Sequence, residues 1–227
     1  SDYVAQYYTQ VMQLFEGCKE HQFTIEFAFS ALAALSASKP DSNSQVVPTL
    51  WSVVFKHSLA LKNYQQAYIA VISNTDHTKR LDCLRRFVIV LCENSELKLL
   101  CETPFIKMID DVINTLVEKA QYTDISRAIN YYHILYAFHV YKSNYRQAAQ
   151  AMFDYACRIG IECNRDTEAL QRQCDSLATC INTLRLVDSR FRWLRSHYTV
   201  ASQANAYANM PPSPKRKRDE NPDDSFA

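Results

Sequence analysis

Apolar residues recur along most of the chain at the three- and four-residue spacing that is typical of amphipathic helices. Segment 105–121 shows the pattern most clearly. Its apolar side chains fall on one stripe of a helical repeat: Phe105, Ile109, Val112 and Leu116. Thr103 and Pro104 stand in front of this stripe, where a threonine N-cap followed by a proline at the first helical position is favourable. The pattern therefore predicts a helix over 105–121.

Two helices are predicted next along the chain. Segment 124–142 is apolar on most sides, which indicates a helix buried between its neighbours. Segment 144–159 starts at an asparagine, a favourable N-cap, and is followed by Gly160, which predicts a glycine stop at the C′ position. Gly17 follows an apolar first helix, and the same role is predicted for it.

The last apolar pattern covers segment 166–194 and predicts a single helix of about 43 Å. Its apolar residues are Leu170, Cys174, Leu177, Ile181, Leu184, Phe191 and Leu194. A rough seven-residue repeat runs through them, but Asp188 occupies a position where the repeat requires an apolar residue. A coiled coil needs three or four clean heptads. We therefore expect a helix docked on its neighbours.

An internal repeat indicates how the helices are arranged. The sequence N-Y-x-Q-A occurs at 63–67 and again at 144–148, 81 residues apart, each time with a capping-box pattern of Asn and Gln. Phe23 and Phe105 fall at intermediate positions, which gives aromatic steps of 41, 41 and 40 residues, although coincidence explains this longer series equally well. Two-helix solenoid repeats have periods in this range. The predicted fold is an all-α solenoid of stacked antiparallel helical hairpins, similar to tetratricopeptide (TPR) repeats.

Glycine usage excludes several other architectures. The chain has 227 residues and only two glycines, Gly17 and Gly160. Tight β-hairpins use glycine where φ is positive, and phosphate-binding loops need closely spaced glycines. An all-β fold, a nucleotide-binding loop and a nucleophile elbow are therefore not expected.

The composition changes near the C-terminus. Residues 1–209 form the predicted solenoid, with a break at 36–44 between the second and third helices, whereas residues 210–227 contain four prolines and are predicted to be a disordered tail. The tail carries a basic run that resembles a nuclear import signal: Lys215, Arg216, Lys217 and Arg218. A solubilising linker is an equally good interpretation, because four acidic residues follow the run.

Side chains that could bind a metal or act in catalysis do not form any recognisable motif in the sequence. The eight cysteines show no C-x-x-C pair and are interpreted as buried apolar thiols. His133 and His139 are six residues apart and do not share a helix face, and Asp76 is predicted to start a helix. A net charge of +1 is too small for a typical nucleic-acid binder. We therefore expect no catalytic activity, metal, cofactor, small-molecule substrate, direct nucleic-acid contact or transmembrane segment. The first residue is not methionine, which suggests a piece of a longer protein.

Three blocks of sequence carry a family resemblance: NYYHILYAFHVY at 130–141, continuing to Gly160, and segments 82–93 and 180–193. They resemble the helical region of the 160-kDa nucleoporin family, a scaffold subunit of the Y-shaped complex of the nuclear pore. The resemblance implies an internal part of a solenoid that follows a β-propeller. It further implies a non-enzymatic scaffold at the nuclear envelope that contacts other Y-complex nucleoporins and supports nucleocytoplasmic transport and mRNA export.

The resemblance also bears on the basic run, because the family has a Pro- and Lys-containing loop near this position, so the run has a third interpretation as an insertion in the solenoid. The alternative function is a soluble TPR-like adaptor that binds peptides and enters the nucleus through Lys215–Arg218.

Overall fold

A computed structural model describes residues 2–36, 45–125, 128–163 and 166–195. These ranges contain ten α-helices and no strand, so the predicted all-α fold is confirmed. The helices are α1 (Asp2–Gly17), α2 (His21–Ser36), α3 (Val46–Ala60), α4 (Tyr64–Ser73), α5 (His77–Glu93), α6 (Leu97–Glu102), α7 (Ile109–Tyr122), α8 (Tyr131–Tyr141), α9 (Tyr145–Glu162) and α10 (Thr167–Leu184).

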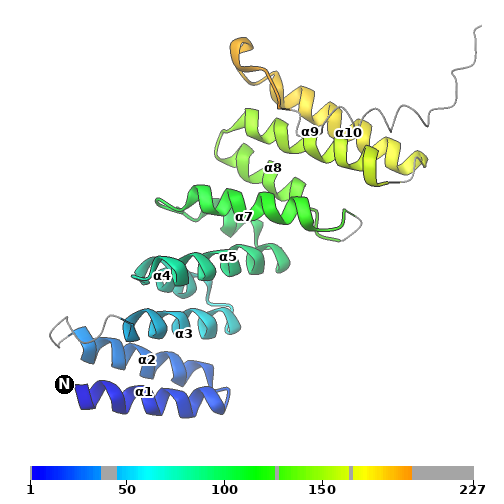
Figure 1. The fold of residues 1–227 in the computed structure, drawn as a ribbon. Coiled ribbons are helices and arrows are strands. Elements are labelled where there is room, and N and C mark those ends of the chain that lie inside the picture. Colours follow the sequence, from blue (N-terminus) through cyan, green and yellow to red (C-terminus); the bar gives the residue numbers. More distant parts are fainter. Residues whose placement is uncertain (1, 37–44, 126–127, 164–165, 196–227) are drawn as a thin grey trace, which may run out of the picture.

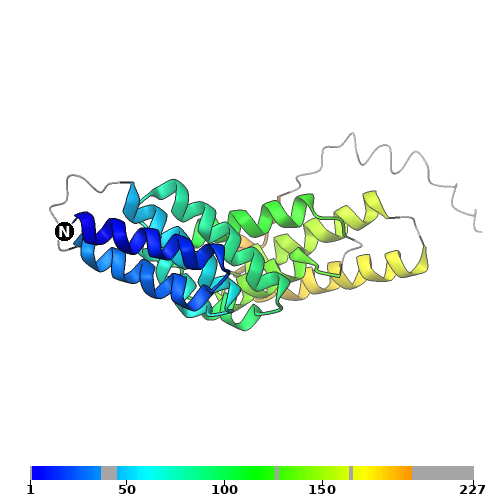
Figure 2. The ribbon, with the colours of Figure 1, turned by 90° about the horizontal axis from the view of Figure 1, so that it is seen from below.

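The helices stack one on the next into an elongated array with α1 at one end and α10 at the other (Figure 1). Helices that follow each other pack as hairpins, as in α1 with α2, α3 with α4 and α8 with α9. Seen from below, the α1 end is displaced sideways from the α9–α10 end (Figure 2). One hydrophobic core runs through the stack from Ala5 in α1 to Cys180 in α10. The predicted solenoid of helical hairpins is therefore confirmed.

Four of the turns between helices use a left-handed residue that is not glycine: Lys19, Lys62, Ser95 and Ser143, with φ between 57° and 62°. Each turn is a Schellman motif. After α8, for example, the N–H of Asn144 donates to the carbonyl of His139 at 2.8 Å, and the N–H of Ser143 donates to that of Val140 at 2.9 Å. The orphan carbonyls at the helix ends are thereby satisfied without glycine.

The prediction that both glycines are helix stops is wrong for Gly160, whereas Gly17 does end its helix but without the left-handed C′ conformation. Gly17 is the last residue of α1, Gly160 lies inside α9, and neither has a positive φ. Gly160 has a different role, since a Cβ atom there would lie 2.6 Å from Nε2 of Gln173 in α10. Gln173 donates from this nitrogen to the carbonyl of Ala156 at 3.0 Å. The absence of a side chain at Gly160 therefore leaves room for a contact between α9 and α10.

Two predicted helices begin later than their apolar patterns suggested. The helix predicted over 105–121 begins at Ile109, because Thr103 is the C-cap of α6 and Lys107 has a left-handed φ of 59°. The helix predicted over 124–142 begins at Tyr131. The side chain of Asn130 caps it by accepting hydrogen bonds from two backbone N–H groups, at 3.0 and 3.4 Å. The prediction that this helix is buried on most sides is confirmed, since six of its residues are buried.

The long helix predicted over 166–194 ends ten residues early, at Leu184. The side chain of Asp188 accepts a hydrogen bond from the N–H of Arg190 at 3.0 Å and starts a 3₁₀ turn, Ser189–Phe191. The residue that breaks the heptad pattern therefore begins a new element. Residues 185–195 fold back toward α9, where the Gln150 side chain meets the backbone of Arg195.

The two N-Y-x-Q-A copies both start helices, but only one shows the predicted cap. Asn63 accepts a hydrogen bond from the N–H of Gln66 at 3.2 Å, whereas the side chain of Asn144 caps nothing. Phe23 lies within α2 and Phe105 lies in the connection before α7. The two N-Y-x-Q-A copies therefore lie at equivalent positions, each at the start of a helix. The four aromatic residues of the longer series do not lie at equivalent positions. The break predicted at 36–44 lies, apart from Ser36, outside the described residues and stays a prediction.

Candidate interaction surfaces

The candidate site residues from the sequence, Lys215, Arg216, Lys217 and Arg218, lie outside the described residues. So does the predicted boundary between the solenoid and its tail at 209/210. The import signal, the linker, the solenoid insertion and the disordered tail therefore all stay predictions.

The cysteines of the described ranges are all free, and those at 83, 92, 101 and 180 are buried. Burial raises the pKa of Cys92 to about 12 and that of Cys180 to about 11. The interpretation as buried thiols is correct for these four positions and wrong for Cys18 and Cys174, which are exposed.

Within the described ranges no group of three metal-ligating side chains comes together, and the helices seen there are too short or too polar to cross a bilayer.

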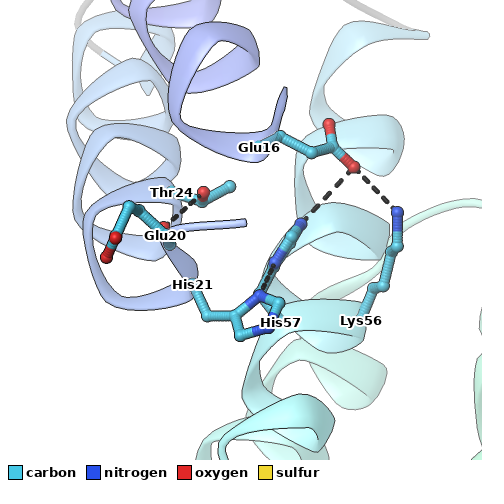
Figure 3. A network of polar contacts seen from close by, with 6 residues as sticks. All are labelled: Glu16, Glu20, His21, Thr24, Lys56 and His57. Atoms are coloured by element: carbon cyan, nitrogen blue, oxygen red, sulfur yellow. Dashed lines mark hydrogen bonds and ion pairs between the residues drawn. The ribbon is translucent and has the colours of Figure 1, made fainter. Parts of the chain in front are cut away.

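A polar junction joins the first three helices (Figure 3). Nδ1 of His21 lies 2.8 Å from Nδ1 of His57, and Glu16 Oε1 lies 3.4 Å from Nε2 of His57 and 2.8 Å from Nζ of Lys56. Because His57 faces the carboxylate with Nε2, that nitrogen carries its proton. Nδ1 of His57 therefore accepts, and His21 donates. Only one proton fits between the two rings.

The outer face of α10 is apolar and exposed. Leu170, Leu177 and Ile181 are 47%, 37% and 54% exposed, and their spacing places them on one side of the helix. We call this set the α10 end face. The helix docks on α9 through a different, small-residue side, about 100° further round the helix, which includes Ala169, Ser176 and Cys180. Docking on a neighbour was predicted. Leu184 of the predicted stripe does pack against the core, but Leu170, Leu177 and Ile181 remain exposed.

A similar face lies at the other end of the stack. Tyr3, Tyr7 and Leu14 of α1 are 87%, 60% and 70% exposed and share one side of the helix. We call this set the α1 end face. Ala5 and Met12 on the other side are buried. Both terminal helices of the described stack therefore bury one side and present apolar residues on the other, as an inner helix of a solenoid would do toward its next neighbour.

A groove of about 780 Å³ lies between α7, α8 and α9. Ile113 and Val117 of α7 and Ala151 of α9 line it, together with Leu135 and His139 of α8. His139 is 4% exposed, and its Nδ1 has no hydrogen-bond partner in the described part of the chain. Burial lowers the pKa of His139 to about 4, so at neutral pH the ring is uncharged. We call this the α7–α9 groove.

The two buried histidines, His57 and His139, are expected to make the folded protein less stable in acid. Burial lowers the pKa of both His139 and His57 below 6.5, so the unfolded chain takes up protons on acidification that the folded chain does not bind. The contribution of these two histidines to the free energy of unfolding is therefore fully present above pH 6.5. It is lost as the pH falls from 6.5 to 4, and His139 accounts for at most about 3 kcal/mol of the loss.

Urea unfolding at several pH values checks this expectation. His139→Gln should flatten the profile between pH 6.5 and 4, and His77→Gln, at the exposed start of α5, serves as the control. The acidic groups that share the groove with His139 are Asp110 and Asp154. An unchanged slope in the His139 variant would show that its ring does not control the acid response.

Comparisons with known proteins agree with this architecture. A family model described as NUP160/120 middle TPR matches residues 1–186. Nuclear pore complex protein Nup160 of Mus musculus is 36% identical over 215 residues, which cover 94% of this chain and 14% of that protein.

Proteins of an insect and a fungus are also similar to this chain. The Nup160 homolog of Drosophila melanogaster is 36% identical over 84% of this chain and 13% of that protein, and nucleoporin NUP120 of Chaetomium thermophilum is 28% identical over 65% and 12%. The chain thus spans 14% or less of the length of these relatives. It belongs to the NUP160/120 family of nuclear pore complex proteins, as a middle, TPR-type piece.

Proposed function

We propose that this chain is a structural segment of the scaffold of the nuclear pore, within its Y-shaped complex. The observation that carries the proposal is the pair of exposed apolar faces at the two ends of the stack. Isolated apolar side chains are common on protein surfaces, but contiguous apolar patches mark interaction sites. In this proposal the α1 and α10 end faces join further scaffold elements, and the assembled scaffold supports nucleocytoplasmic transport and mRNA export.

The relatives support the location and the kind of partner. Their names identify nuclear pore complex proteins, and a solenoid offers extended side surfaces for protein partners. Its partners are then other nucleoporins of the complex.

The experiment changes the α10 end face in the protein that carries this chain. Leu177→Asp with Ile181→Asp places two charges on the exposed apolar face, where both side chains are more than a third exposed. We expect the fluorescently tagged variant to lose most of its nuclear-rim signal, with co-purification of other scaffold nucleoporins reduced at least tenfold. Circular dichroism of the isolated chain should be unchanged.

The matched control is Gln171→Asp with Asn182→Asp, which adds the same charge to exposed polar positions of the same helix. It should retain the rim signal. Equal rim signals for the two double variants would contradict the proposal.

A third variant replaces Lys215–Arg218 with alanine and tests the alternative function. Loss of nuclear entry in that variant would favour the alternative adaptor function, whereas a retained rim signal supports the scaffold.

A further inference from the structure

The segment that follows α10 concentrates positive charge. Residues 185–195, RLVDSRFRWLR, contain four arginines and one aspartate, hence a net charge of +3, whereas the whole chain has a net charge of only +1. We call this segment the arginine turn, and it lies beyond the end of α10 (orange in Figure 1). All four of its arginine side chains are exposed. An exposed concentration of one charge sign is typical of a surface that attracts the opposite charge.

Hydrogen bonds hold the arginine turn in a defined shape. Nε of Arg192 donates to the carbonyl of Val187 at 2.7 Å, and an Nη atom of Arg192 donates to the carbonyl of Arg185 at 3.1 Å. At the end of the turn, the side chain of Gln150 in α9 donates to the carbonyl of Arg195 and accepts from its N–H, both at 2.8 Å. The cations are therefore presented in a fixed arrangement, which reduces the entropy that is lost when a partner binds.

A tryptophan of the turn orients two guanidinium groups. The guanidinium of Arg146 in α9 lies 4.4 Å from the centre of the Trp193 ring, and that of Arg195 lies 5.6 Å from it. A guanidinium that stacks on a ring still offers its N–H groups at its edge, where they match the two oxygens of a carboxylate. Trp193 therefore prepares these arginines for carboxylate binding.

Three of the four arginines in the turn have no carboxylate partner. Arg190 forms an ion pair with Asp188, whose Oδ1 lies 3.2 Å from Nε of Arg190. Among the described residues, no ion pair involves the other three, Arg185, Arg192 and Arg195. Asp188 is the one carboxylate in the sequence of the turn. The three remaining cations are therefore available to the carboxylates of a partner.

Exposed apolar side chains alternate with these cations and indicate which kind of anion fits. Leu186, Phe191 and Trp193 are all exposed, so a matching partner carries apolar side chains as well as negative charge. A single-stranded nucleic acid fits less well, because base stacking needs a free aromatic face. The guanidinium groups of Arg146 and Arg195 already lie over the ring of Trp193.

We propose that the arginine turn binds an acidic peptide segment of a protein partner. The carboxylates of this segment pair with Arg185, Arg192 and Arg195, and its apolar side chains pack on Leu186 and Phe191. Charge complementarity carries the assignment, since complementary charges select a partner and set its orientation. The surface differs from the α1 and α10 end faces, which are apolar, and the proposal does not depend on the scaffold function.

Fluorescence polarisation with the full chain tests the proposal. The first probe is a labelled synthetic peptide in which Asp and Glu alternate with Leu and Phe, and the second replaces every Asp by Asn and every Glu by Gln. The acidic peptide should bind at least tenfold more tightly than the neutral one, and its affinity should fall as the salt concentration rises. A labelled oligouridine of the same length is the third probe. Equal binding of the two peptides, or tighter binding of the oligouridine, would overturn the proposal.

A double variant locates the binding site. Arg185→Gln with Arg195→Gln removes two cations of the turn but retains Arg192, whose hydrogen bonds hold its shape. We expect the acidic peptide to bind this variant at least tenfold more weakly, with an unchanged circular dichroism spectrum. The matched control is Arg85→Gln with Arg86→Gln, which removes the same charge from exposed positions of α5 and should retain the affinity. Unchanged affinity in the first variant, or an equal loss in the control, would overturn the proposal.

Discussion

Replacing Lys19, Lys62, Ser95 and Ser143 together with glycine is expected to stabilise the protein by about 2–4 kcal/mol. These four residues have left-handed φ angles of 62°, 57°, 60° and 59°. A residue with a Cβ atom is strained by roughly 1–2 kcal/mol in this conformation. Glycine relieves the strain, but it also makes the unfolded chain more flexible, so each site contributes a net gain of about 0.5–1 kcal/mol.

Thermal unfolding followed by circular dichroism measures the effect. For a chain of this size the quadruple variant should unfold roughly 5–15 °C higher. The control is Ala178→Gly, at an exposed and right-handed position inside α10, which should lower stability by about 1 kcal/mol. If the four substitutions destabilise the protein as the control does, the turns are not left-handed in solution.

Replacing Arg158 with methionine is expected to destabilise the protein by roughly 2–4 kcal/mol. The side chain of Arg158 is 9% exposed, and its guanidinium forms an ion pair with Glu162 of the same helix, with Nε 2.5 Å from Oε1. It also donates to the carbonyl of Ala120 in the last turn of α7 and to the hydroxyl of Tyr132 in α8. One side chain of α9 therefore satisfies groups on two other helices, and its loss leaves them buried without a partner.

Urea unfolding, with hydrogen exchange of the last turn of α7, measures this loss. Glu162→Gln is the matched control, because Glu162 is 42% exposed and its removal should cost at most about 1 kcal/mol. Exchange should accelerate in α7 only for the arginine variant. Equal stability of the two variants would show that the ion pair, and not the contact between helices, is what matters.

Much of the helical architecture was predictable because it is local. The periods of apolar residues identified the bodies of α7, α8, α9 and α10. Asp76 was correctly predicted to start a helix, because its side chain accepts from the N–H groups of Thr78 and Lys79 at the start of α5. Helix ends were predicted less well. Thr103 and Pro104 have the chemistry of a helix start, yet in the structure Thr103 ends α6. The same residue types suit several positions in a turn, so a local pattern leaves the choice open.

The candidate surfaces were less predictable, because they depend on contacts between distant segments. His21 and His57 are 36 residues apart, and their pairing exists only because α2 and α3 pack together. Arg158 of α9 likewise connects α7 and α8, and this connection also exists only because the three helices pack together. The α7–α9 groove left no local signal in the sequence, since its lining comes from three helices.

By itself, the sequence determined an all-α chain of short-linked helices and its family, because periodicity and caps are local and the NYYHILYAFHVY block is specific. Only the tertiary structure decided which side of α10 is buried. The apolar stripe indicated the side with Leu170, Leu177 and Ile181, but the partner helix α9 packs against the small residues Ala169 and Ser176. Two helices pack where small side chains let them approach closely, so the large residues remain on the outside as the end face.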